Sequence, residues 1–276
     1  MNEALKSAMM NLMPLHRWAT HGKIRDAEEA IRLVGNRPSY ADMIRMAGEH
    51  KAPPAYGYDA DATSRRGKYR AKQMMKLLDG KDSCRVLELG CWDGMVEYWL
   101  QHYNINAFGL DNRDEGFDDK AKRCVYVRDA HDLDWLDSCF PLVFSYDCME
   151  HFADPAKVLS EAYRVTKPGG LIYLMFGPLY NSPFGLHAYR EIPIPYCQHL
   201  FAREMLYDYM IDYEQLNTWT LSMFRTLLFG CGKVLKYKEY PDARYVSLIS
   251  QYPSCFPIRN IDEYLVSHIE VLIRKD

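Results

Sequence analysis

Two acidic residues stand near the ends of apolar runs of the kind that form buried strands. Glu88 lies in the run VLELGCWDG, residues 86–94, which passes from an apolar stretch into a turn containing Gly90 and Gly94. Asp111 closes the next apolar run, about 20 residues beyond that turn. A tight glycine turn lets the backbone approach a nucleotide-like ligand, and an acid at the second strand end can accept hydrogen bonds from ribose hydroxyls. The two features predict a site for an adenosine-containing cofactor.

The same turn lacks the glycines that a pyrophosphate requires. A dinucleotide loop has the pattern G-x-G-x-x-G, whereas this turn reads Glu88-x-Gly90-x-x-x-Gly94, with Trp92 and Asp93 inside it. Acids on both sides of the turn would repel a pyrophosphate and suit a cationic cofactor without phosphate. S-adenosylmethionine carries a sulfonium, an ammonium and a ribose diol. The pattern therefore disfavours NAD(P) and FAD.

The elements that must position these residues alternate between strands and helices from residue 85 onward. Apolar runs predict strands over 86–89, 107–110, 124–127, 142–146 and 171–176, a strand near 234–237, and a final strand within 264–274. Periodic segments predict helices over 64–78, 94–102, 156–165 and 221–228. Such alternation is typical of an α/β fold, a doubly wound and mostly parallel sheet covered on both faces.

Two segments interrupt this rhythm. Residues 1–60 carry helix-period apolar positions separated by short breakers and predict a helical N-terminal extension. Residues 177–220 are rich in prolines and aromatics, and a loop of this length in a compact domain is usually functional. We interpret residues 61–276 as the cofactor-binding domain, with 177–220 as a lid or substrate insertion. The basic run at residues 65–70 reads as the solvated start of a helix.

In these segments the chain resembles the class I S-adenosylmethionine-dependent methyltransferases of the small-molecule "type 11" kind. Residues 86–94 look like the first cofactor motif and residues 109–111 like the ribose-binding strand end. Residues 129–133 resemble the motif beside the adenine, and residues 144–155 and 167–170 the fourth-strand motif and the turn before strand five. The resemblance covers residues 66–177 well. It implies the family's Rossmann-like, seven-stranded methyltransferase fold.

The resemblance also implies roles for individual residues. Those around the methionine and ribose would be Glu88, Gly90, Cys91 and Gly94. Asp111 would accept from the ribose hydroxyls, with Asn112 beside the adenine. Asp129 would bind the exocyclic amine of the adenine, with the backbone of Ala130 at a ring nitrogen. Tyr146 and Asp147 would flank the methionine end. The family usually has glycine where this chain has Trp92.

Methyl transfer to a hydroxyl requires a base, and three histidines are candidates. His187 and His199 lie in the insertion, and His151 follows the fourth predicted strand. Each is read equally well as a structural residue. A divalent metal held by His187, His199, Glu150 and nearby acids is a weaker alternative. The aromatics of the insertion suit a partly apolar or ring-containing small-molecule acceptor, although packing within the lid explains them almost as well: Tyr180, Phe184, Tyr189, Tyr196 and Phe201.

Composition limits the remaining classes of function. A formal net charge of −3 argues against a protein whose main role is to bind nucleic acid. The eight cysteines form no Cys-x-x-Cys pair and predict free thiols in a reducing compartment. With neither a signal-peptide pattern nor a long apolar run, we expect a cytoplasmic enzyme without membrane contact. A homodimer through the N-terminal helices is an open expectation.

Three functions compete. The leading one is O-methylation of a small molecule by a lid histidine acting as base, with S-adenosylhomocysteine as product. N-methylation, or methylation of a protein or RNA, ranks lower, since the Asn-Pro-Pro-Tyr type of motif is absent at residues 145–148. A non-catalytic S-adenosylmethionine-binding scaffold is the third.

Overall fold

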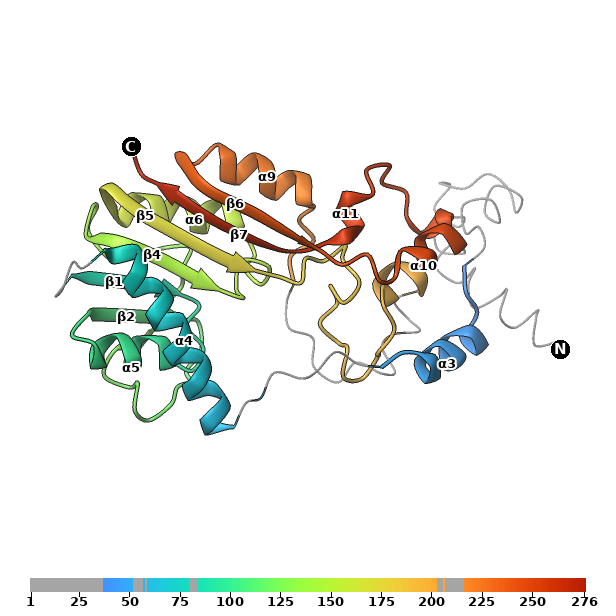
Figure 1. Ribbon diagram of the computed structural model, residues 1–276, viewed down its shortest axis with the longest axis horizontal. Coiled ribbons are helices and arrows are strands. Elements are labelled where there is room, and N and C mark those ends of the chain that lie inside the picture. The colour runs from blue at the N-terminus through green and yellow to red at the C-terminus, as the bar shows by residue number, and fades with distance from the viewer. Residues whose placement is uncertain (1–36, 52–56, 58, 80–83, 203–205, 207–215) are drawn as a thin grey trace. The chain divides into compact units, whose positions relative to one another are not determined.

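The computed structural model describes residues 37–51, 57, 59–79, 84–202, 206 and 216–276 (Figure 1). Most of the predicted helical extension of residues 1–60, the expected dimerisation element, lies outside the described residues. The described part of the chain divides into two compact units. The sheet unit comprises residues 56–177, 215–240 and 268–276, and the helical unit comprises residues 1–55, 178–214 and 241–267.

A seven-stranded sheet forms the centre of the sheet unit, in the order β3-β2-β1-β4-β5-β7-β6 (Figure 1). The strands are β1 Arg85–Leu89, β2 Asn106–Asp111, β3 Val125–Val127, β4 Phe140–Tyr146, β5 Thr166–Phe176, β6 Lys233–Pro241 and β7 Val266–Arg274. β1 pairs in parallel with β2 and β4, β2 with β3, and β4 with β5, while β7 runs antiparallel to β5. The predicted α/β fold with a mostly parallel sheet is confirmed.

Helices cover both faces of this sheet. The chain crosses from β1 to β2 through α5 (Met95–His102) and from β4 to β5 through α6 (Pro155–Val165), in opposite directions along the sheet. Right-handed crossovers therefore place α5 and α6 on opposite faces. α4 (Ala60–Leu78) packs beside α5, and side chains of both helices share one core with β1, β2 and β4. α9 (Leu221–Phe229) brings Phe224 against Phe176 of β5, with ring centroids 4.9 Å apart.

The helical unit contains short helices around an aromatic core. Its described elements are α3 Tyr40–Glu49, α7 Cys197–Leu200, α10 Val246–Gln251, the 3-10 turn Pro253–Cys255 and α11 Asp262–Leu265. Tyr196 and Tyr264 are almost fully buried, and the hydroxyl of Tyr196 donates to the carbonyl of Tyr264 at 3.0 Å. Residues 178–202 thus bury their apolar side chains together with residues from 241–267.

Two expectations from composition can be compared with the structure. All eight cysteines are free thiols, as predicted. Within the described ranges, no helix combines the length and the apolar character that crossing a bilayer demands.

Candidate functional site

The acids singled out in the sequence meet at the carboxyl edge of the parallel sheet. In the ladder, Glu88 of β1 stands beside Gly109 of β2 on one side and beside Phe144 of β4 on the other. Asp111 ends β2, and Asp147 follows the last residue of β4. In open α/β sheets this edge, near the point where strand order reverses, is where ligands bind. β1 and the strands on either side of it form that point.

The turn after β1 is tied to β2 by its backbone. The N–H groups of Gly90 and Cys91 both donate to the carbonyl of Leu110, at 2.8 and 2.9 Å. Gly90 has a φ of +73°, and a Cβ at this position would lie 2.1 Å from Sγ of Cys148. Only glycine satisfies both the left-handed backbone and the close approach of the segment that follows β4.

Trp92 occupies the position where the family usually has glycine. Its φ is +46°, a left-handed conformation that is costly for a side chain with a Cβ. Its N–H donates to Oδ2 of Asp111 at 3.0 Å, and its indole lies against Gly116, where a Cβ would come within 2.8 Å of the ring. The side chain is 41% exposed. Trp92 therefore joins the turn after β1 to the loop after β2.

Gly94 begins α5 for a packing reason. Its φ is +71°, and a Cβ there would lie 2.5 Å from Val125 and 2.7 Å from Ala121. Beside it, Oδ1 of Asp93 accepts from the N–H of Met95 at 2.9 Å. Burial raises the pKa of Asp93, while that N–H and the nearby Arg66 oppose the rise. The contacts of Gly94 are thus with β3 and the segment before it.

Below the turn, Glu88 meets a second buried acid, Glu97 of α5. The two residues are 2% and 0% exposed. Glu88 is the ladder partner of Gly109, and a Cβ at Gly109 would lie 2.9 Å from the carboxyl carbon of Glu97, so the two buried carboxyl groups lie on the same side of β1 and β2. Among the described residues, Oε2 of Glu88 and both carboxyl oxygens of Glu97 have no hydrogen-bond partner. Burial raises the pKa of Glu97 to about 7, and burial together with the charge of Glu97 raises the pKa of Glu88 well above its usual range. Glu97 is not among the predicted site residues, and its place within the otherwise apolar pattern of α5 was the available signal.

Two arginines of α4 reach the site and correct the interpretation of the basic run as solvated. Arg66 pairs with Asp93 at 3.2 Å, and Arg70 pairs with Asp147; the arginine side chains are only 20% and 17% exposed. The guanidinium of Arg70 also lies over the ring of Tyr146, 4.4 Å from its centroid. The two arginines are spaced i, i+4, next to the buried Gly67 and Ala71 on the same helix. This spacing was the signal that both side chains lie near the packed face of α4, and it was missed in the sequence.

Tyr146 and Asp147 end β4 in a constrained geometry. The Tyr146 hydroxyl donates to Oε1 of Gln73 at 2.9 Å, and burial raises the pKa of this phenol far above its usual range. Asp147 has a φ of +49°, and its N–H donates to the carbonyl of Met175 at 2.7 Å. Burial also raises the pKa of Cys91 and Cys148 well above the usual range. Both thiols stay protonated at neutral pH, which excludes a cysteine nucleophile here.

Asp129 lies after β3 and binds a histidine. Its Oδ1 accepts from the N–H of His131 at 2.9 Å and contacts Nδ1 of the same residue at 2.6 Å. The N–H of Asp154 donates to Nε2 of His131, so Nδ1 carries the hydrogen that faces Asp129. The backbone N–H of His131 is the main cause that lowers the pKa of Asp129. Ala130 is buried, and Asn112 is exposed beside Asp111.

The three candidate bases lie in different surroundings. His151 belongs to the turn that follows β4 in the sheet unit, four residues after Asp147. His187, in the helical unit, donates from Nε2 to the carbonyl of Pro178 at 2.9 Å. His199 lies among the rings of Tyr180, Phe256 and Tyr264, and burial lowers its pKa to about 4. A base role for any of the three stays a prediction.

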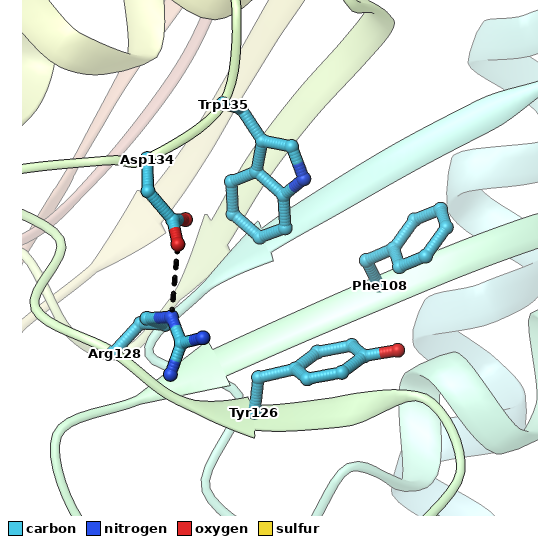
Figure 2. Close-up of a pocket in the computed structure, with 5 residues that line it drawn as sticks. All are labelled: Phe108, Tyr126, Arg128, Asp134 and Trp135. Carbon is cyan, nitrogen blue, oxygen red and sulfur yellow. Dashed lines mark hydrogen bonds and ion pairs between the residues drawn. The ribbon is translucent and has the colours of Figure 1, made fainter.

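A hollow lies away from this site, on the sheet face opposite to the one covered by α4 and α5. Figure 2 shows Phe108 of β2 and Tyr126 of β3 beside Trp135, with Arg128 and Asp134 paired at its rim at 3.3 Å. Phe108 alternates with Ala107 and Gly109, which face α4 and α5, so it points to the other side. The hollow is distinct from the acids at the carboxyl edge.

Comparison with known proteins identifies the domain that carries this edge. Residues 87–174 match the family described as "Methyltransferase domain". The chain is 35% identical over 80 residues to phosphoethanolamine N-methyltransferase 2 of Caenorhabditis elegans, a match covering 29% of this chain and 18% of that protein. It is 26% identical over 165 residues to 27-O-demethylrifamycin SV methyltransferase of Amycolatopsis mediterranei, covering 55% and 61%.

Solved structures show the same fold. One named as an S-adenosylmethionine-dependent methyltransferase of Listeria monocytogenes superposes with a TM-score of 0.52 at 14% identity, over 76% of this chain and 97% of that one. At this identity the likeness shows the fold alone. The matches cover less than two thirds of the length of each of the two curated relatives named above.

Proposed function

Because the chain carries a class I S-adenosylmethionine-dependent methyltransferase domain, we propose that it transfers a methyl group from this cofactor to a small-molecule acceptor. The observation that carries the proposal is the set of acids at the carboxyl edge of β1, β2 and β4, together with the buried Glu88. Such an edge suits a ligand with positive charge and a diol and opposes a pyrophosphate. When bound, the cofactor supplies an already activated methyl carbon.

The residues present fit the parts of this cofactor. Oε2 of the buried Glu88 has no hydrogen-bond partner among the described residues, and an unpartnered carboxyl oxygen favours a nearby cationic donor. Asp111 uses one carboxylate oxygen for Trp92 and keeps the capacity to accept from a ribose diol. Asp129 and the Ala130 backbone flank the proposed adenine side. Arg70 and Asp147 offer opposite charges to the two ends of an amino acid.

Within the domain, the protein's own task is orientation. The backbone bonds from Gly90 and Cys91 to Leu110 fix the turn, and the Trp92 bond to Asp111 fixes that carboxylate. A rigid support of this kind holds a methyl donor in line with its acceptor. Because the two reacting groups are already oriented when bound, the activation free energy of the transfer is lower. Gly94 contributes by allowing α5 to start against β3.

We further propose a hydroxyl acceptor whose proton is taken by His151 or His187. Both side chains are half-buried, and histidine is the side chain that most often serves as a general base in proteins. His199 is the least suited of the three, because a pKa of about 4 makes it a weak base. The relatives named above include both an N- and an O-methyltransferase, so an amine acceptor is the alternative.

Calorimetric titration with S-adenosylmethionine and S-adenosylhomocysteine tests the cofactor. We expect the full chain to bind both, and Asp111→Ala to weaken binding at least tenfold. Asp114→Ala, an exposed acid in the same loop, is the matched control and should bind as the wild type does. If neither compound binds the wild type, the proposed function is wrong.

The acceptor atom is tested with S-adenosylmethionine bearing a labelled methyl group. Hydroxyl-bearing and amine-bearing compounds are offered separately, and products are identified by mass. His151→Asn and His187→Asn should each be compared with the wild type. If label enters only amines, or if both variants keep full activity on hydroxyls, the O-methylation proposal falls.

A further inference from the structure

Glu97 is a buried acid that the proposed function leaves without a role. It stands in the first turn of α5 and is fully buried. β2 makes room for it with Gly109, where a Cβ would come within 2.9 Å of the Glu97 carboxyl carbon. Glu88 is the ladder partner of Gly109, so its side chain lies beside the Glu97 carboxyl on the same face of the sheet. The fold thus places two acids together beneath the turn that faces the cofactor.

Burying two carboxyl groups together has an electrostatic cost that one shared proton reduces. A carboxylic acid can donate to a neighbouring carboxylate, whereas two carboxylates repel each other. The start of α5 favours negative charge on Glu97, because this residue lies in the first turn, near the positive end of the helix dipole. We therefore assign the shared proton to Glu88 and the negative charge to Glu97.

The surrounding charges do not neutralise that single negative charge. From α4, Arg70 acts on Glu88, but its guanidinium is already paired with Asp147. Asp93, from the turn before α5, raises the pKa of both acids, and Asp93 is itself paired with Arg66 of α4. The two acids in turn raise the pKa of neutral thiols and of a phenol, which lie in that turn, just before β3, at the end of β4 and just after it: Cys91, Cys124, Tyr146 and Cys148. The pair lies in a negative environment that a bound cation would relieve.

We propose that Glu88 and Glu97 form a one-proton carboxyl pair that favours the cationic cofactor over its neutral product, which makes Glu97 a positioning residue for S-adenosylmethionine. This inference rests on the proposed function. With its sulfonium, S-adenosylmethionine carries one net positive charge more than S-adenosylhomocysteine. A singly negative pair therefore holds the cofactor more strongly than the product left after transfer.

The sign of the pH dependence follows from the two states of the pair. As pH falls through about 7, Glu97 takes up a proton and the pair becomes neutral. A cation binds the negative pair better, so binding at low pH releases that proton, and affinity falls as pH falls. S-adenosylmethionine should bind more weakly at pH 5.5 than at pH 7.0, by up to about 16-fold, which is the limit for one linked proton whose pKa is about 7 in the unliganded protein. The ligand's ammonium stays charged throughout.

The experiment measures binding of both compounds by calorimetry at pH 5.5 and 7.0. Each titration is run in two buffers with different ionisation enthalpies, which counts the protons released. We expect proton release at pH 5.5 with S-adenosylmethionine, and a smaller effect with S-adenosylhomocysteine. In Glu97→Gln the affinity for S-adenosylmethionine should change less than twofold between the two pH values.

Two further variants complete the test. The double variant Glu88→Gln, Glu97→Gln removes the pair and should release no proton. Asp134→Asn changes an exposed acid on the opposite sheet face and should keep the wild-type pH dependence. If the wild type binds and the double variant keeps the wild-type proton release, the inference is overturned while the proposed function stands. A wild type that binds neither compound would instead refute the proposed function.

Discussion

The backbone N–H of Trp92 donates to the carboxylate of Asp111 at 3.0 Å, from a residue whose φ is +46°. The bond links the turn after β1 to the acid proposed for the ribose. It is made by a side-chain-bearing residue in a conformation that glycine adopts freely. Substitutions of Trp92 can separate the effect of its backbone strain from the effect of losing its indole contacts.

Replacing Trp92 with glycine or with alanine removes the same indole contacts, but only glycine removes the strain. The left-handed conformation costs a residue with a Cβ about 1 kcal/mol. We expect Trp92→Gly to be more stable than Trp92→Ala by about 1 kcal/mol in urea unfolding. Equal stabilities would mean that the turn changes its backbone conformation when the indole is lost.

Glu97 should make the protein less stable as pH rises. Its pKa is raised from 4.5 to about 7 in the folded state, so the folded protein binds more protons than the unfolded chain between these values. Stability is then highest below pH 4.5 and is lost as pH rises through about 7. Unfolding at several pH values should show a fall of up to about 3 kcal/mol from this group. Glu97→Gln should lack that fall, and Asp134→Asn should retain it.

Arg70 should matter through its shape as well as its charge. Its planar guanidinium pairs with Asp147 and stacks over Tyr146, which a lysine ammonium cannot do in the same way. We expect cofactor affinity to fall about tenfold or more in Arg70→Met and by a smaller factor in Arg70→Lys. Calorimetry measures both, and thermal unfolding checks that each variant is folded. An Arg70→Met variant that binds as the wild type does would remove Arg70 from the site.

His199 should act on stability rather than on the rate of transfer. Since burial lowers its pKa from 6.5 to about 4, its contribution is present above pH 6.5 and is lost as pH falls toward 4. Loss of about 2–3 kcal/mol is expected over this window. Because aromatic rings surround it, His199→Phe should fold and show less acid sensitivity in pH-dependent unfolding. A folded His199→Phe variant without activity would restore His199 as a candidate base.

The strands and helices of the sheet unit could be predicted because their signals are local. Apolar runs and helix-period patterns placed β1, β2, β4 and α6 within a few residues of their observed bounds. The turn glycines and Asp111 followed from position along the chain. The functional meaning of Arg66, Arg70 and Glu97 could not be read in this way, since it depends on which helix face packs over which strand.

In the helical unit, too, packing between segments far apart in the sequence could not be predicted. Residues 178–202 read as an isolated aromatic insertion, and nothing in their own pattern specifies that residues 241–267 complete their core. His199 illustrates the consequence. A histidine in an aromatic loop suggests chemistry, yet Phe256 and Tyr264 reach its ring from a segment more than 50 residues away. Periodicity carries no information about such long-range packing.

The position of β7 between β5 and β6 sets the order in which the molecule can be assembled during synthesis. β6 emerges from the ribosome before the strand that joins it to the sheet, and β5 keeps an open edge for the same interval. At 5–20 residues per second, the roughly 30 residues from β6 to the end of β7 take about 2–6 s to make. For that time an apolar strand edge is available to other nascent chains. Translation speed through residues 241–274 should therefore influence the yield of folded protein.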